Sequence, residues 1–185
     1  MSLLYCYTAS SHPKSLSPSS ADFAQLRSNL YIVTPTGSTV LMDGTLTQYD
    51  STYSNELNGM DARKMSNFSE NWGMLRGATT YVIERRHSIV NTDSIFFKMW
   101  NMRIITYRIE IITANLDKSL RTGVLKDAYL KSKITLDLNG TTFIDFSVTA
   151  DPASKASDRF RILFNTPPPI PVTFTSTKHF SKAIQ

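Results

Sequence analysis

Short segments in which apolar and polar residues alternate follow one another along most of this chain. In residues 107–113 the alternation predicts a strand with one buried face and one face in water. Further segments rich in β-branched and aromatic residues occur at 81–83, 94–100, 134–138, 141–148 and 160–164. Many short strands, separated by turn residues about every 8–12 positions, are typical of a sandwich or jelly roll. We therefore expect an all-β fold, an antiparallel β-sandwich of jelly-roll or Ig-like type, with few short helical turns.

Two turn dipeptides lie between such segments and predict hairpins. Asp43-Gly44 separates the apolar runs 40–42 and 46–49, and Asn139-Gly140 separates two of the segments named above. Asp-Gly and Asn-Gly supply the positive φ angles of a type I′ turn. In both places we expect the flanking segments to pair directly across the turn.

Composition changes divide the chain into four parts. Residues 1–28 are rich in Ser and are expected to form a poorly structured segment, with at most a helical turn around Leu26. Residues 29–165 carry the strand segments and form the predicted sandwich. Residues 166–171 contain four prolines, which lack the amide hydrogen that a sheet needs, and are expected to form a stiff linker. Residues 172–185 are expected to be either the start of a following domain that is cut short or a strand docked on the sandwich.

The composition is that of a globular protein, because 41% of the residues are hydrophobic and 19% are charged. No apolar run approaches the roughly 20 residues that span a bilayer, so we expect no transmembrane segment. The net charge is +5, and basic and acidic residues are interleaved along the chain. Because the chain lacks the block of like charges typical of nucleic-acid arms, we expect no nucleic-acid partner. The N-terminal residues do not form a convincing signal peptide, so an exported form would need a longer precursor.

Residue types that carry catalysis or bind metals are scattered. His12, His87 and His179 share no ligand spacing, and Cys6 is the single cysteine. The sequence contains neither a Gly-x-Ser-x-Gly elbow nor a Gly-x-Gly-x-x-Gly loop. Acidic residues near predicted turns are Asp43, Asp50, Asp137 and Asp151. They could supply calcium ligands, but hydrogen bonding within the turns is the stronger interpretation. We expect no catalytic residue, no metal and no cofactor.

Aromatic residues supply the main candidate for ligand binding. Trp72, Tyr49, Tyr53 and Tyr81 could together form a face on which a sugar ring stacks, because a flat ring offers both a π-face and apolar area. Trp100 lies in an apolar segment and is expected in the core. Burial in the core also competes with ligand stacking at Trp72, and the general tendency of Trp to be buried favours it.

Several separated strings of residues form a series along the chain. They are 58–65, 70–76, 83–86, 93–97, 125–130 and 151–164, the last followed by a Pro-rich stretch and 171–175. This series, over roughly residues 40–178, resembles a module near the C-terminus of large Bacteroidetes surface proteins. The resemblance implies secretion by the type IX system, attachment at the cell surface and a sorting domain that follows the module. It implies no catalytic residues. The chain shows no sorting domain, and we expect it to belong to a longer polypeptide.

These observations favour a non-enzymatic structural or adhesive module of a large exported bacterial cell-surface protein. Its partners would be the rest of that protein and cell-surface glycans or polysaccharide. An alternative is a carbohydrate-binding sandwich with Trp72 at its stacking face. A third hypothesis, an enzyme such as a jelly-roll hydrolase, needs a pair of acids that sequence alone does not place together. In each case Phe160 and Ile162 are expected to enter the core, with Asp158 in the preceding turn.

Overall fold

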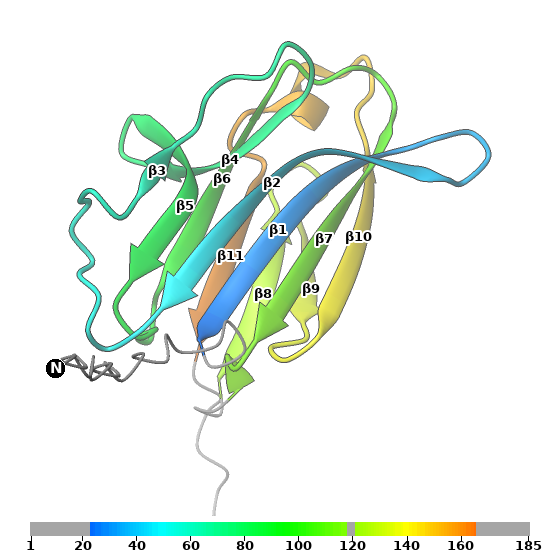
Figure 1. Cartoon of the computed structure of the whole chain (residues 1–185). Helices are drawn as coiled ribbons and strands as arrows, with labels where there is room; N and C mark the ends of the chain where they lie inside the picture. The colour runs from blue at the N-terminus through cyan, green and yellow to red at the C-terminus, as the bar shows by residue number, and fades with distance from the viewer. Residues whose placement is uncertain (1–22, 118–120, 166–185) are drawn as a thin grey trace, which may run out of the picture.

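The computed structural model describes residues 23–117 and 121–165 and confirms the all-β class (Figure 1). The strands are β1 (Ala24–Val33), β2 (Thr39–Tyr49), β3 (Ala62–Arg63), β4 (Asn71–Arg76), β5 (Thr79–Arg86), β6 (Ser94–Trp100), β7 (Thr106–Ala114), β8 (Thr122–Asp127), β9 (Ser132–Leu136), β10 (Thr141–Ser147) and β11 (Phe160–Asn165). A turn of 3₁₀ helix, η2 (Pro152–Lys155), precedes β11. The expected linker 166–171 and the segment 172–185 lie outside the described residues.

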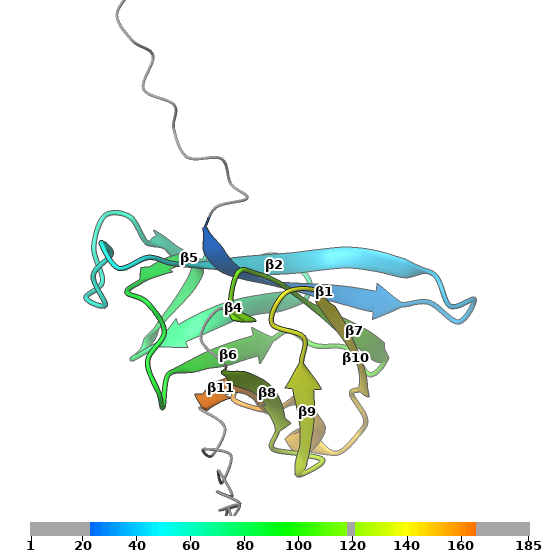
Figure 2. The same ribbon diagram turned by 90° about the horizontal axis from the view of Figure 1, so that it is seen from below.

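These strands form one mixed sheet with the order β10-β7-β1-β2-β5-β4-β6-β11-β8-β9, and β3 pairs with β5 outside this path. β2 and β5 run parallel, whereas the other pairs are antiparallel. The sheet curls until it is nearly closed into a barrel, with β1, β2 and β7 on one side and β6, β8 and β11 on the other (Figure 2). The predicted antiparallel sandwich is not confirmed. Alternation reports which face a strand buries and does not report which strand lies beside it.

The first strand begins inside the segment that was expected to be poorly structured. β1 starts at Ala24, and Leu26, Ser28 and Leu30 are all fully buried. The two leucines are four residues apart, a spacing that also fits a helix, but the buried serine between them follows the two-residue period of a strand. Ser28 can be buried because its hydroxyl oxygen accepts a hydrogen bond from the Trp72 indole at 2.9 Å. The expected helical turn around Leu26 was wrong.

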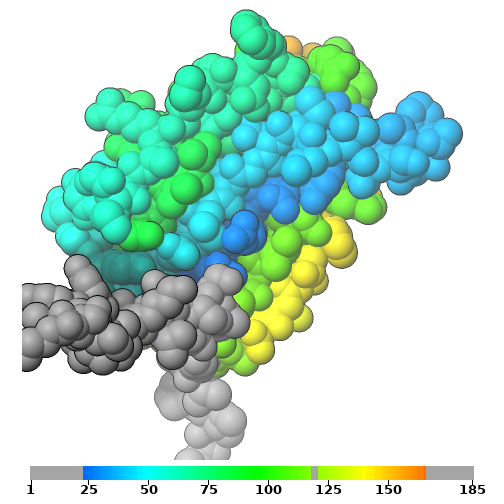
Figure 3. Space-filling model, in the orientation of Figure 1, coloured from blue at the N-terminus to red at the C-terminus, as the bar shows by residue number. Residues whose placement is uncertain are grey.

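The predicted hairpin at Asp43-Gly44 was also wrong, because both residues lie within β2. They lie next to a bulge in β2, because Leu30 pairs with Asp43 while the next residue of β1, Tyr31, pairs with Leu41. The turn between these strands is formed by residues 34–38, where the Thr34 amide donates to the Ser38 carbonyl at 2.8 Å. Gly37 in this turn has a φ of 84°, the conformation that glycine adopts most readily. The paired strands project beyond their neighbours as an arm (Figure 1, Figure 3).

Asp43 and Gly44 lie where β2 packs closely against β1 and the start of β4, and they do not form a turn. A Cβ atom on Gly44 would lie 2.7 Å from the Asn29 side-chain oxygen on β1, so glycine fits this position best. The Asp43 carboxylate accepts from the Trp72 amide at 2.8 Å and pairs with the Lys64 ammonium at 2.8 Å. Asp43 therefore fixes the start of β4 and the loop before it against the middle of β2.

The dipeptide Asn139-Gly140 likewise does not close a paired hairpin. It joins β9 to β10, which lie at opposite ends of the strand path. The Thr113 amide donates to the Gly140 carbonyl at 2.9 Å, and the Asp137 carboxylate accepts from the Asn139 amide at 2.9 Å. The connection therefore docks on β7, while the hairpin partner of β9 is β8.

Aromatic rings from strands far apart in the sequence fill the interior. Trp72 stacks on Phe97 with ring centroids 4.5 Å apart, and Phe160 meets Phe146 edge-on at 4.8 Å. Phe160 and Ile162 are buried at alternate positions of β11, which confirms the prediction for this strand. The side chains on the other face of these strands are left on the outside of the sheet, where they form the surfaces described next.

Candidate functional site

The four aromatic residues expected to form a sugar-stacking face do not share an accessible surface. Trp72 is fully buried, and Tyr49 and Tyr81 are only 3% and 5% exposed. Tyr53 is half-buried, with the Arg85 guanidinium 5.3 Å from its ring centroid. The platform around Trp72 is excluded, because a buried ring has no face to offer. Burial of Trp72, which the general tendency of tryptophan favoured, is what the structure shows, because β4 turns this ring inward.

Trp100 takes the opposite place from the one expected. It is half-buried on the outer face of β6, with the Lys98 ammonium 5.6 Å and the Lys64 ammonium 5.9 Å from its ring centroid. An open groove of about 480 Å³ lies beside it, and Arg63 and Thr80 also contribute to its lining. Of the two tryptophans, Trp100 is the one that reaches the surface.

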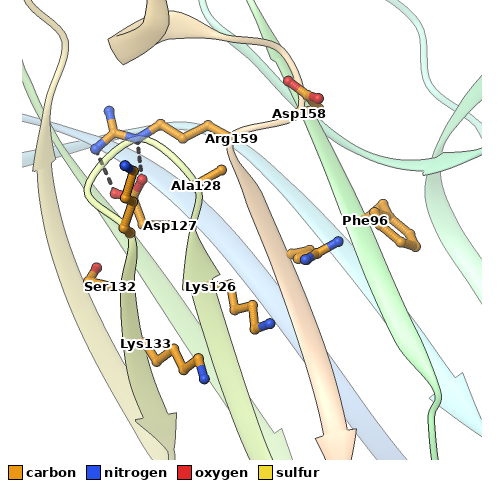
Figure 4. A pocket seen from close by; sticks show the side chains of 10 residues that line it. Phe96, Lys126, Asp127, Ala128, Ser132, Lys133, Asp158 and Arg159 are labelled. Carbon is orange, nitrogen blue, oxygen red and sulfur yellow. Dashed lines mark hydrogen bonds and ion pairs between the residues drawn. The ribbon is translucent and has the colours of Figure 1, made fainter.

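A second hollow, of about 380 Å³, lies over the outer face of β6, β11, β8 and β9 (Figure 4). Strand pairing builds it: Phe96 on β6 lies opposite Arg161 on β11, Arg161 lies opposite Lys126 on β8, and Lys126 lies opposite Lys133 on β9. Directly opposed residues project to the same face of a sheet. Arg161, Lys126 and Lys133 therefore form a line of cations across three strands, which we call the basic row.

The hollow itself, called the basic cleft below, carries more positive than negative charge. Lys131, in the turn between β8 and β9, adds a fourth cation to its lining, and Asp158 adds an acid. Within residues 23–117 and 121–165, none of Arg161, Lys126, Lys133 and Lys131 forms an ion pair. Lys131 also holds a left-handed backbone with a φ of 54°, which costs a non-glycine residue roughly 1–2 kcal/mol.

The inner wall of the basic cleft is a buried ion pair. The Arg159 guanidinium donates two hydrogen bonds to the Asp127 carboxylate, at 2.9 and 2.7 Å, and both side chains are almost fully buried (Figure 4). The same guanidinium donates to the carbonyls of Ser147 and Ser154, at 3.1 and 2.6 Å. Buried charges need such complete pairing. Arg159 therefore links the ends of β8 and β10 to helix η2. Because its guanidinium is engaged in these hydrogen bonds, it does not bind a ligand in the cleft.

Asp127 also shapes the turn that carries Lys131. One of its carboxylate oxygens accepts hydrogen bonds from the backbone amides of Tyr129 and Leu130, at 2.9 and 3.1 Å. These bonds fix the path of the chain between β8 and β9. The turn is set by a buried carboxylate, so the position of Lys131 at the rim depends on the core of the molecule.

Comparable buried carboxylates tie other segments together. The pairs are Asp43 with Lys64, Glu84 with Arg76 and Arg86, and Glu70 with Arg103. Glu70 accepts from the Arg103 guanidinium at 2.6 Å and from the Tyr107 hydroxyl at 2.9 Å. Burial alone would raise the pKa of Glu70, but these hydrogen bonds and the Arg103 charge outweigh it, so this pKa lies below its ordinary value. The pairs of Asp43 and Glu70 join segments that are far apart in the chain, whereas those of Glu84 lie within the β4–β5 hairpin.

Residues 23–117 and 121–165 contain no group of three or more His, Cys, Asp or Glu side chains arranged to hold a metal ion. In the same part of the chain, no helix has the length and apolar character needed to cross a membrane. No family model, curated protein or solved structure matches this chain.

Sequence reasoning missed the basic row entirely. Two of its members lie on the hairpin formed by β8 and β9, and the third lies on β11, which comes later in the chain. Each occupies a polar position and looks like an ordinary solvent-facing residue. The alternation correctly assigns Arg161 to the outer face of its strand, since Phe160 and Ile162 point inward. No local signal shows that Lys126 and Lys133 lie beside it, because that depends on which strands pair.

Proposed function

We propose that this chain is a non-enzymatic structural and adhesive module of a larger exported bacterial cell-surface protein. The observation that supports this proposal is that charged residues in the strings that resemble surface-protein modules form buried ion pairs inside the fold. Asp127 and Arg159, from two of these strings, pair with each other, and Lys64, Glu70 and Glu84, from three more, are engaged in buried ion pairs. Charged residues whose side chains are engaged in buried ion pairs stabilise the fold.

The resemblance also supports export by the type IX system, with a longer polypeptide as the exported species. A module of this kind would space or attach other parts of that polypeptide. The sheet is nearly closed on itself, and the buried Asp127–Arg159 pair holds the ends of β8 and β10 together, which suits a rigid spacer.

Surface location is the property to test. Antibodies raised against the purified chain should label intact source cells, and brief protease treatment of those cells should remove the label. An immunoblot should detect the module in a polypeptide larger than 20.8 kDa. Label that appears only after the cells are lysed, on a polypeptide of that mass, would contradict the proposal.

The carbohydrate-binding alternative also has one observation in its favour. The outer face of the sheet carries the half-buried Trp100 beside Lys98 and Arg63, and within residues 23–117 and 121–165 neither of these cations forms an ion pair. Such a surface is suited to a charged sugar. This alternative is compatible with an adhesive module, since adhesion requires a ligand on the outer surface.

A further inference from the structure

We propose that the outer face of β6, β11, β8 and β9 binds an acidic polysaccharide of the polyuronate type. The basic row would contact successive carboxylates, and Trp100 would stack on a sugar ring at the end of β6. This inference rests on the proposed function, because it is the location at a cell surface that makes a polysaccharide, rather than a nucleic acid, the expected polyanion.

The spacing of the basic row is the first reason. Arg161, Lys126 and Lys133 occupy directly opposed positions on neighbouring strands. Neighbouring strands lie about 4.8 Å apart, so the row presents a regular line of positive charge across the sheet. A linear polymer with a carboxylate on each repeating unit can contact several members of such a line at once, and the contributions add.

The second reason is that this arrangement opposes stability. Like charges directly opposite each other destabilise a sheet, and within residues 23–117 and 121–165 no carboxylate forms an ion pair with a member of the row. Lysines at the end of a sheet can protect an open edge, and that role accounts for Lys133 and for Lys131 beside it. It does not account for Lys126 and Arg161, which lie on strands paired on both sides. A ligand that neutralises the row explains why all of them are cationic.

The third reason is the continuity of the row with an aromatic surface. Phe96 is 44% exposed and lies opposite Arg161, and Lys98 and Trp100 follow it at alternate positions of β6 on the same outer face. Phe96 and Trp100 are therefore about 13 Å apart along the strand. The groove beside Trp100 adds the exposed cation of Arg63. A pyranose ring carrying a carboxylate matches a tryptophan flanked by cations.

The test measures binding of the full chain to polygalacturonate oligomers, with neutral dextran oligomers and a DNA oligonucleotide of equal charge as comparisons. The wild-type chain should bind polygalacturonate most tightly, and added salt should weaken the binding. The triple variant Arg161→Gln/Lys126→Gln/Lys133→Gln should bind about tenfold more weakly, because three surface ionic contacts are lost. Replacement of outward-facing cations by Gln should leave the sheet folded.

A matched control removes the same charge elsewhere. Arg27, Arg121 and Lys155 lie on other surfaces and line neither the basic cleft nor the Trp100 groove. Arg27→Gln/Arg121→Gln/Lys155→Gln should change the affinity less than about twofold. If the control weakens binding as much as the row variant does, attraction by net charge accounts for the result and the site is overturned.

Trp100 supplies a separate readout. Trp72 is buried and Trp100 is half-buried, so an oligosaccharide should change the fluorescence of Trp100 alone, and Trp100→Phe should abolish that change. Failure of the wild-type chain to bind polygalacturonate, or tighter binding of DNA through the same three cations, would overturn the polysaccharide inference. The surface-labelling experiment decides the proposed function independently, so a labelled surface without polyuronate binding would leave a spacer module and remove only its ligand.

Discussion

At the scale of the residue, Arg159 shows how this fold keeps a full charge in its interior. The residue is 2% exposed, and the rings of Tyr129, Phe146 and Phe160 have their centroids 4.9–5.0 Å from the guanidinium carbon. Its nitrogens donate to Asp127 and to two backbone carbonyls, so the desolvated charge is satisfied by polar partners and by the faces of aromatic rings.

Removal of the Arg159 charge should therefore destabilise the protein severely. Arg159→Met would leave the Asp127 carboxylate buried without its cation, and we expect the free energy of unfolding to fall by about 3–5 kcal/mol. Chemical denaturation followed by circular dichroism measures this loss. Arg161→Met, on the exposed side of the same strand, is the control and should change stability by less than about 0.5 kcal/mol. Equal effects of the two substitutions would contradict the assignment of Arg159 as a structural ion-pair partner.

At the scale of the element, the arm formed by β1 and β2 shows that a dipeptide typical of a hairpin turn can lie inside a strand. Asp43-Gly44 has the composition of a hairpin turn but sits at a close approach inside β2. The turn is at residues 34–38, and Gly37 is the residue in it with a positive φ. Glycine suits both places, for positive φ in one and for lack of a Cβ atom in the other.

This placement of the turn predicts different costs for two glycine substitutions. Gly37→Ala should lower the free energy of unfolding by about 1 kcal/mol, because alanine is strained at the φ of 84° while the space around its Cβ is open. Gly59→Ala also adds a methyl group in open space, but without a positive φ, and should be close to neutral. Thermal unfolding of the two variants compares them directly. A neutral Gly37→Ala would place the turn elsewhere.

At the scale of the whole molecule, curling of the sheet brings distant strands around one aromatic interior. Phe160 on β11 lies 6.0 Å from Trp72 on β4 and 4.8 Å from Phe146 on β10, measured between ring centroids. β11 stands between β6 and β8 in the strand path, so its inward side chains close the interior between the two sides of the curled sheet.

A charge at the centre of this interior should prevent folding. Phe160→Asp would bury a second carboxylate among aromatic rings, and the nearby cation, Arg159, is already paired with Asp127. We expect the variant to lose the cooperative unfolding transition and the near-ultraviolet circular dichroism of packed aromatic rings. Arg161→Asp, one residue further along, faces outward and should fold. A soluble Phe160→Asp variant that melts cooperatively would refute the inward placement of this strand.

The sequence alone determined the all-β class, the inward positions in β11 and the segments that form β5, β6, β7, β9, β10 and β11. These follow from alternation and residue type, which are properties of neighbouring residues and need no knowledge of the rest of the fold. The pattern also correctly reports that residues 107–113 lie in a strand, now β7.

Only the tertiary structure decided which strands are neighbours, and with that the candidate site. The burial of Trp72 and the outward position of Trp100 depend on how the whole sheet curls. Lys126 and Lys133 align within the β8–β9 hairpin, but Arg161 joins them only because β11, which is distant in the chain, pairs with β8. Pairing is set by the closure of the whole sheet over its interior, because each strand must bury its apolar face against strands on the opposite side. A local pattern determines which face of a strand is buried, whereas the strands that lie beside that face are determined by the complete fold.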